Sequence, residues 1–326
     1  MTLPKTISGL FVGLLLLMVG PFLPAQATTS TPSPSIGTAV TAPPRELLFW
    51  KAVRGRSVLY LLGAIHLAGP EIYPLNPAIT TAFTSSSTLI VEIDVQRISP
   101  AVLRKLVKKY GYYPDTDSLD RHLSADLLQK VLDWARRVNF PAESALRMRP
   151  WMLESVLSTV QAGDTKLSAA DGVDNHFLTI AHGDGMKIEG LETAAEQLES
   201  ISAMSEELQV RSLEKAVMGI QEDHNDLLEL YEAWKKGDLK KFTELVVAPF
   251  DTDDQMRAVF EDLFAVRNKR WVTKLDRIAA GDGTRFMVVG AGHLVGPDNV
   301  RDLLAANGWT VTRVTPQNSL PAGAEQ

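Results

Sequence analysis

The chain has 326 residues, 45% of them hydrophobic and 22% charged, which is the composition of a globular protein with one large domain or two small ones. Its formal net charge is −6 and it has no basic tract, so nucleic acid is not expected as a partner. The absence of cysteine excludes a disulfide scaffold, a cysteine nucleophile and a thiolate metal site. Any metal must therefore be held by His, Asp, Glu or Asn.

Residues 1–27 have the three parts of a secretory signal peptide. Lys5 precedes the apolar run 7–20, and Ala25-Gln26-Ala27 is a typical cleavage site. The run is shorter than the roughly 20 residues of a permanent membrane helix, although retention as an uncleaved anchor is the alternative. We therefore expect an exported protein, periplasmic or secreted, with no permanent membrane span after cleavage.

The mature sequence divides into a linker, one folded domain and a tail. Residues 28–45 are rich in Thr, Ser and Pro and predict a flexible linker. A single folded domain is predicted over residues 46–317, because no internal linker divides it. Residues 318–326 are predicted to form a loose tail.

Strand patterns lie at both ends of this domain. Two apolar runs around Arg54-Gly55-Arg56 predict a β-hairpin, followed by a helix at 76–83 and a strand at 87–95. Helical patterns dominate from residue 100 to 278, with a short strand at 187–192. The chain then returns to a strand at 285–293, a helix at 299–308 and a strand at 309–314. The order predicts an α/β fold, with a central sheet from the N- and C-terminal strands and a large intervening helical block.

One device occurs twice in the sequence. GAIHLAGPE (63–71) and GAGHLVGPD (290–298) share six of nine positions, and each follows an apolar, β-prone run. A lone histidine at a strand end is usually structural, bonded to a backbone partner. Two copies with the same flanks are much harder to explain by packing. If the strands are parallel, His66 and His293 reach the same carboxyl edge of the sheet, where open α/β sheets bind ligands.

A carboxylate could complete this pair of histidines. Glu92 and Asp94 alternate along the apolar strand LIVEIDV, and a buried charge there is costly unless it is paired or bound to a cation. Glu92 is surrounded by apolar neighbours, which favours a ligand or general base over a structural ion pair. Asp94, nearer the strand exit, could be solvated or capping.

Two histidines and one carboxylate suit a divalent metal with an open position for water. The H-E-x-x-H motif is absent, so a zincin-type protease is not predicted. No G-x-S-x-G elbow, P-loop or dinucleotide fingerprint occurs either.

Other polar residues have blander interpretations from the sequence alone. Asp174 lies at the start of a predicted helix, where capping is the commoner role. Glu192 could cap the following helix, and Arg267, beside Asn268, is expected to form an exposed salt bridge. His122, His182 and His224 have no recognisable spacing and are interpreted as surface residues.

Taken together, several blocks in this order resemble the TraB/GumN family, which is related to the Tiki metalloproteases. The blocks are LLGAIHLAGPEIYPL, STLIVEIDV, GVDNHF, KIEGLETAAEQL, RNKRW and FMVVGAGHLVGPDNVRDLLAANGWTV, and they extend from about residue 47 to 314. The resemblance implies a shared α/β fold with an active centre of His66, Glu92 and His293. It also raises Asp174, Glu192, Arg267 and Asn268 to residues that support the centre or contact substrate.

The resemblance implies divalent-metal-dependent peptide cleavage, with Mn, Co or Zn as the metal and a peptide or protein as the substrate. His66, Glu92 and His293 would hold the metal, and Arg267 would stabilise developing negative charge. The alternative is an envelope protein that binds a peptide, metal or haem on the same fold without chemistry. A degenerate scaffold is a third interpretation, against which both intact histidine motifs count.

Overall fold

The computed structural model describes residues 47–163, 165–221 and 226–315. The predicted signal peptide, the linker at 28–45 and the tail at 318–326 lie outside the described residues. In the described ranges, no helix has both the length and the apolar character that a membrane crossing requires.

The predicted hairpin is confirmed as β1 (Phe49–Arg54) and β2 (Ser57–Ala64). Its turn uses Gly55 at a φ of 60°, a conformation that glycine adopts without strain. β1 also pairs antiparallel with the last strand, β6 (Thr310–Arg313), so that the two ends of the domain meet in one sheet.

The rest of the sheet is parallel. β2 pairs with β5 (Gly283–Gly290), β5 with β3 (Thr88–Val91), and β3 with β4 (Lys187–Gly190). The strand order is β4-β3-β5-β2-β1-β6. This confirms the predicted α/β fold and places the two strands that precede the histidine motifs side by side.

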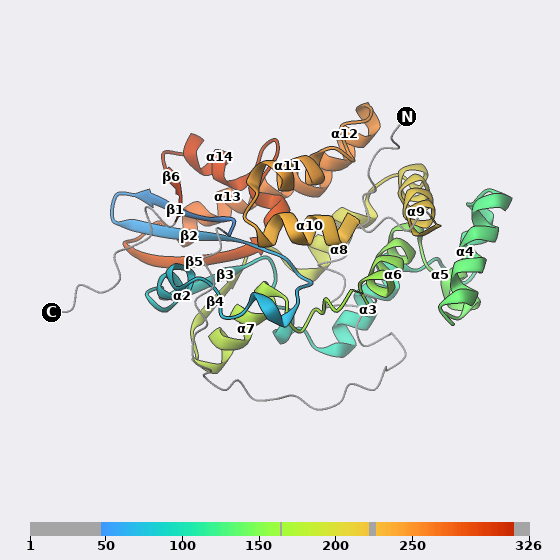
Figure 1. Cartoon of the computed structure of the whole chain (residues 1–326), viewed down its shortest axis with the longest axis horizontal. Coiled ribbons are helices and arrows are strands. Elements are labelled where there is room, and N and C mark those ends of the chain that lie inside the picture. The colour runs from blue at the N-terminus through green and yellow to red at the C-terminus, as the bar shows by residue number, and fades with distance from the viewer. Residues whose placement is uncertain (1–46, 164, 222–225, 316–326) are drawn as a thin grey trace.

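Helices cover the sheet on both sides. Figure 1 shows α2 (Pro77–Thr84) and α7 (Val173–Gly183) below the strands, and α13 (Val266–Ile278) and α14 (Val300–Ala306) above them. The fully buried ring of Phe286 in β5 lies 5.5 Å from that of Phe83 in α2 and 4.9 Å from that of Phe177 in α7. Aromatic packing of this kind fixes the helices against the sheet.

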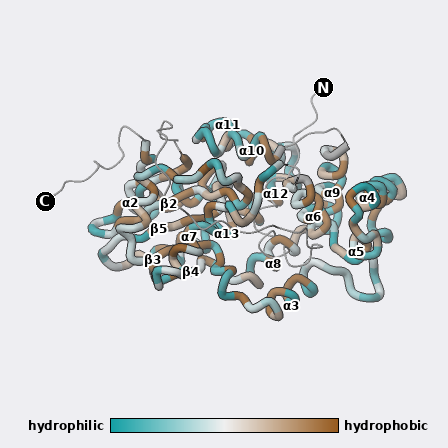
Figure 2. The backbone as a smooth tube through the Cα atoms, turned by 60° about the horizontal axis from the view of Figure 1, so that its bottom comes forward, coloured by the Kyte–Doolittle hydropathy of each residue, from teal (hydrophilic) through white to brown (hydrophobic). Residues whose placement is uncertain are grey.

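The helical block extends from one end of the sheet (Figure 1). Its outer helices are α3 (Pro100–Gly111), α4 (Ala125–Arg137), α5 (Ala142–Arg147), α6 (Pro150–Gly163) and α9 (Glu206–Gln221). The helices of the block that lie nearer the sheet are α8 (Ala194–Ser202), α10 (Asp226–Lys235), α11 (Leu239–Val247) and α12 (Asp254–Phe260). Figure 2 shows the central strands as mainly hydrophobic, whereas α4 at the far end is largely hydrophilic, as expected of an amphipathic helix that buries only one face.

The last part of the predicted helical pattern, which ends at residue 278, is interrupted. Between α12 and α13 lies a π-helical turn, η5 (Glu261–Ala265). Such turns change the helical register and are frequent at functional sites. Here the turn directly precedes Arg267 and Asn268.

Candidate functional site

The two histidine motifs meet at the carboxyl edge of the parallel strands. Ala64 of β2 pairs with Gly290 of β5, so the motif copies lie beside each other with an offset of one residue. His66 follows β2 by two residues, and His293 lies in the short helix η6 (Ala291–Leu294) that follows β5 directly.

His66 is held by Asp174. The ring Nδ1 lies 2.9 Å from Asp174 Oδ2, in the first turn of α7. Gly172 precedes that turn, and a Cβ there would lie 2.4 Å from the carbonyl oxygen of His66, so only glycine lets α7 begin this close. Burial lowers the pKa of His66, but the carboxylates of Asp174 and Glu92 outweigh it and raise the pKa to about 8. Because Nδ1 is bonded to Asp174, the other ring nitrogen, Nε2, is left for the site.

His293 is held in the same way by Asn268. The Asn268 amide nitrogen donates to the Asp298 carbonyl at 3.0 Å, so its oxygen faces His293 and accepts from Nδ1 at 2.6 Å. The ring of Trp271 lies 4.1 Å from the imidazole. Burial, with a further contribution from nearby Arg267, lowers the pKa of His293 well below its usual value. His293 is therefore neutral, with the lone pair of Nε2 4.0 Å from Glu92 Oε1.

Glu92 is the first residue after β3, not a residue within the strand as predicted. The strand ends at Val91, although the Glu92 carbonyl still accepts from the Glu192 amide at 2.9 Å. Glu92 is only 6% exposed, and its Oε1 accepts a hydrogen bond from the Gly290 N–H at 2.7 Å. Burial raises the pKa of Glu92, opposed mainly by Arg267.

Gly290 lies beside all three side chains. A Cβ at this position would lie 3.1 Å from Glu92 Oε1, 3.2 Å from His66 Nε2 and 3.8 Å from a carbon of His293. Residues 66, 92 and 293, distant in sequence, thus surround one glycine.

Arg267 is buried, which makes the expectation of an exposed salt bridge wrong. It is only 5% exposed and forms ion pairs with both Glu92 and Glu192. Its Nη2 donates to Glu92 Oε2 at 3.1 Å, and its Nη1 donates to the Leu263 carbonyl at 3.0 Å. A buried guanidinium between two carboxylates satisfies charges that would otherwise be costly. Glu192 likewise contacts Arg267 rather than capping α8, whose capping residue is Thr193.

Gln197 is part of this network and was not predicted. It is fully buried in α8, and its amide donates to Glu92 Oε2 at 3.2 Å and to Glu192 Oε1 at 2.9 Å. The buried residues of α8 are Ala194, Gln197, Leu198 and Ile201. A glutamine at a core-facing position of an amphipathic helix is the sequence feature that could have identified it.

Two of the histidines interpreted as surface residues have acidic partners. His182 lies 2.9 Å from Asp94, which is itself neither purely solvated nor capping. His122 lies 3.0 Å from both Asp117 and Glu206. His224 lies outside the described residues.

The side chains at the site are of the kinds that bind a divalent cation. Each imidazole is oriented through Nδ1 by an oxygen, a usual arrangement for metal-binding histidines, and Glu92 supplies a carboxylate. Three carboxylates, those of Glu92, Glu192 and Asp174, face the guanidinium of Arg267 and the imidazole of His66, whose pKa of about 8 favours its protonated form. Acidic groups therefore outnumber the basic ones at the site. In the described residues, however, no group of three or more His, Cys, Asp or Glu side chains is arranged so that it could hold a metal ion. The site thus fits a cation in donor type and charge, but its side chains are not closed on one point.

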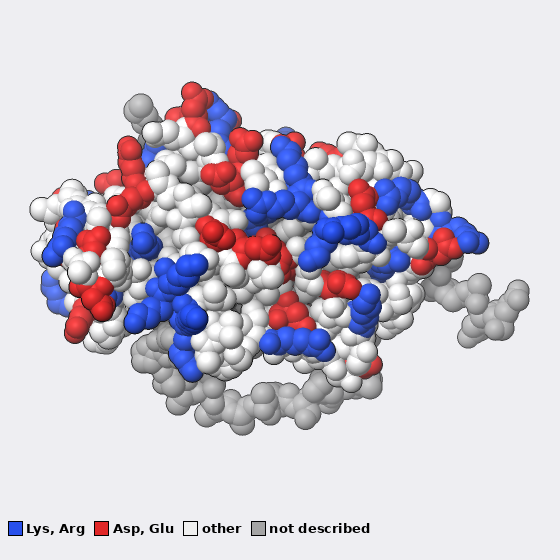
Figure 3. Space-filling view, turned by 180° about the vertical axis from the view of Figure 1, so that it is seen from behind, with Lys and Arg blue, Asp and Glu red and all other residues white. Residues whose placement is uncertain are grey.

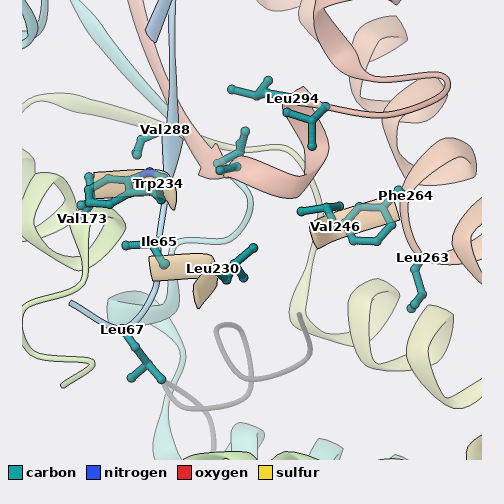
Figure 4. Packing of buried hydrophobic residues seen from close by; sticks show 14 of the residues in the cluster. Ile65, Leu67, Val173, Leu230, Trp234, Val246, Leu263, Phe264, Val288 and Leu294 are labelled. Carbon is teal, nitrogen blue, oxygen red and sulfur yellow. The ribbon is translucent and has the colours of Figure 1, made fainter. Parts of the chain in front are cut away.

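An apolar shell surrounds the histidine motifs. Figure 4 shows Ile65 and Leu67, which flank His66, in one core cluster with Trp234 and Leu230 of α10. Trp234 also donates its ring N–H to the Gly63 carbonyl at 2.8 Å. Such a shell restricts water and strengthens electrostatic interactions within the site.

Comparison with known proteins gives a family but no described activity. A family model described as the TraB/PrgY/gumN family matches residues 48–313. A protein of Treponema pallidum (strain Nichols), described only as an uncharacterized protein, is 23% identical over 310 residues, which cover 90% of this chain and 89% of that protein. No solved structure matches the chain. Since the family model spans most of the sequence, the chain belongs to the TraB/PrgY/gumN family.

Proposed function

We propose that this protein is an exported, divalent-metal-dependent hydrolase that cleaves peptides or proteins. One observation carries the proposal: the Nε2 atom of His66 and Oε1 of Glu92 both lie within 3.2 Å of the Cβ position of Gly290, with His293 beside them. Family membership supports it only in general terms, because fold and family do not fix a reaction.

His66, His293 and Glu92 would hold the cation through Nε2, Nε2 and Oε1. Imidazole and carboxylate ligands suit Zn, Mn or Co. When bound, a divalent cation lowers the pKa of its water and polarises a carbonyl oxygen.

The remaining side chains would act by orienting these three. Asp174 and Asn268 fix the rotation of the two imidazoles. The guanidinium of Arg267 donates hydrogen bonds to Glu92, Glu192 and the Leu263 carbonyl. We therefore assign it to orienting Glu92 and favouring its charged form, rather than to contacting an oxyanion. Gln197 braces the same carboxylates from α8.

The test is metal analysis of the purified protein together with cleavage of a peptide library in Mn²⁺, Co²⁺ or Zn²⁺. His66→Ala, His293→Ala and Glu92→Gln should each lose bound metal and at least about a hundredfold in activity. His182→Ala is the matched control, because that imidazole pairs with Asp94 and not with Glu92. Activity that survives in both His66→Ala and His293→Ala contradicts the proposal.

A binding protein would give a different result. Tight peptide binding without turnover in all three metals, or a haem Soret band, would favour the non-catalytic alternative. Export is tested separately by N-terminal sequencing of the expressed full chain, with cleavage expected after Ala27.

A further inference from the structure

A cavity lies in the helical block, apart from the sheet edge. It has a volume of about 480 Å³ and lies between α3, the segment that follows α3, and α5. Val107, Tyr112 and Tyr113 are among the residues that line it. Pockets for small ligands usually measure roughly 300–1,000 Å³. No residue of the histidine site contributes to this cavity.

One wall of the cavity is held in place by Arg147. Its guanidinium donates to the carbonyls of Pro114 at 3.2 Å and Asp117 at 3.1 Å, and it pairs with Asp115 at 2.5 Å. Tyr113 is buried, with its ring stacked on His122 at 4.7 Å. The segment is therefore ordered before any ligand arrives, which reduces the entropy lost on binding.

The opposite wall carries two basic side chains that form no ion pair or hydrogen bond within the described residues. Arg104 and Lys108 line the cavity one turn apart on α3, and neither has an ion-pair or hydrogen-bond partner in the part of the chain that the structure describes. α3 contains no acidic residue, whereas the whole chain has a net charge of −6. Figure 3, which views the molecule from behind, shows Lys and Arg side chains gathered at the lower left, the side that corresponds to the lower right of Figure 1, where α3 is labelled. Two acidic residues also line the cavity: Asp115, which pairs with Arg147, and Glu143 of α5.

We propose that this cavity is a binding site for a small anionic ligand with an apolar or aromatic part. The anionic group would pair with Arg104 and Lys108, and the apolar part would pack on Val107 and the tyrosine rings. The proposal does not depend on hydrolysis at the sheet edge.

The probe is 8-anilinonaphthalene-1-sulfonate, a fluorescent aromatic anion, titrated into the intact protein. We expect saturable binding at one site that weakens by about tenfold in the double variant Arg104→Glu/Lys108→Glu, because two ligand-facing cations become anions. The matched control is Lys105→Glu/Lys109→Glu, which makes the same change in charge on the same helix at residues that do not line the cavity. All four positions are exposed, so both double variants are expected to fold, as circular dichroism would check.

The neutral analogue N-phenyl-1-naphthylamine separates charge from apolar contact. It should bind wild type and Arg104→Glu/Lys108→Glu equally. Ser144→Trp, from the α5 wall, should fill the cavity and weaken both probes. Equal weakening of the sulfonate probe in the two double variants would reduce the effect to general surface charge and overturn the proposal, as would the absence of saturable binding to wild type.

Discussion

Two buried polar clusters in this molecule are built in opposite ways. At the sheet edge, Arg267 lies between Glu92 and Glu192, and donors reach the oxygens of both carboxylates. In the helical block, Glu154 of α6 faces Ser212 and Lys215 of α9. Glu154 is only 1% exposed, yet neither carboxylate oxygen has a hydrogen-bond partner among the described residues.

The two glutamates are both buried, but they differ in how many groups stabilise their charge. Burial raises the pKa of both Glu92 and Glu154, but at Glu92 a guanidinium, the Gly290 N–H and a protonatable imidazole oppose it. At Glu154 the influence of Ser212 and the charge of Lys215 offset burial only in part, and the pKa rises to about 7. The sheet edge therefore surrounds its buried carboxylates with donors and opposite charge, whereas the α6–α9 contact leaves a buried carboxyl whose pKa is about 7.

Removal of the central guanidinium should have the largest effect. Arg267→Met leaves two buried carboxylates unpaired, and we expect the free energy of unfolding to fall by about 3–5 kcal/mol. Urea denaturation measures the change. The control is Arg257→Met, because Arg257 is exposed and its pairs with Asp251 and Asp254 are solvated. Similar losses in the two variants would mean that the buried network contributes no more than a surface pair.

Glu154→Gln should stabilise the protein, and only at higher pH. The pKa of Glu154 is about 7 in the folded protein and 4.5 ordinarily. Below pH 4.5 the carboxyl is protonated in both the folded and unfolded states, so its titration does not change the free energy of unfolding. Between pH 4.5 and 7 only the unfolded state loses the proton, so the folded state is increasingly destabilised. The variant should therefore gain about 3 kcal/mol over wild type between pH 4 and pH 8. Denaturant midpoints at several pH values test this. A difference between the two proteins that does not change with pH would contradict it.

The parts of this site that follow from local pattern could be predicted from the sequence. The repeated strand-Gly-x-x-His device predicts two strands that end in a ligand, and parallel pairing of β2 with β5 confirms their common edge. Glu92 was identified because a charge among β-branched and apolar residues demands a partner.

The rest depends on contacts between distant segments. Asp174 bonds to His66 across 108 residues, and nothing near Asp174 distinguishes it from a capping residue. Arg267 resembles an exposed residue until the π-helical turn before it and the packing of α13 on the sheet are known. Glu154 lies in an ordinary helical pattern, so its missing partners are visible only once α6 and α9 are packed together.

Gly290→Ala should have a smaller effect on stability and a large one on the site. The added Cβ would lie 3.1 Å from Glu92 Oε1 and 3.2 Å from His66 Nε2, so both side chains must move, at a cost of about 2 kcal/mol. The proposed metal binding and hydrolysis should fall more steeply than stability. Gly281→Ala is the control, because a Cβ there would contact only the end of Arg285, at 4.0 Å. Unchanged activity in Gly290→Ala would show that the three side chains do not work at this point.

The smallest effect tests the comparison most directly, with two serines that are both 5% exposed. Ser57 donates to the Ala279 carbonyl at 3.2 Å and accepts from Arg285, whereas the hydroxyl of Ser212 has no hydrogen-bond partner in the described residues. A buried polar group stabilises only when it is bonded, so Ser57→Ala should cost about 1 kcal/mol and Ser212→Ala less than about 0.5 kcal/mol. Urea denaturation at pH 4, where Glu154 is neutral, isolates the hydroxyl from the carboxylate beside it. Equal losses would mean that Ser212 is bonded after all, and that the α6–α9 contact is as well satisfied as the sheet edge.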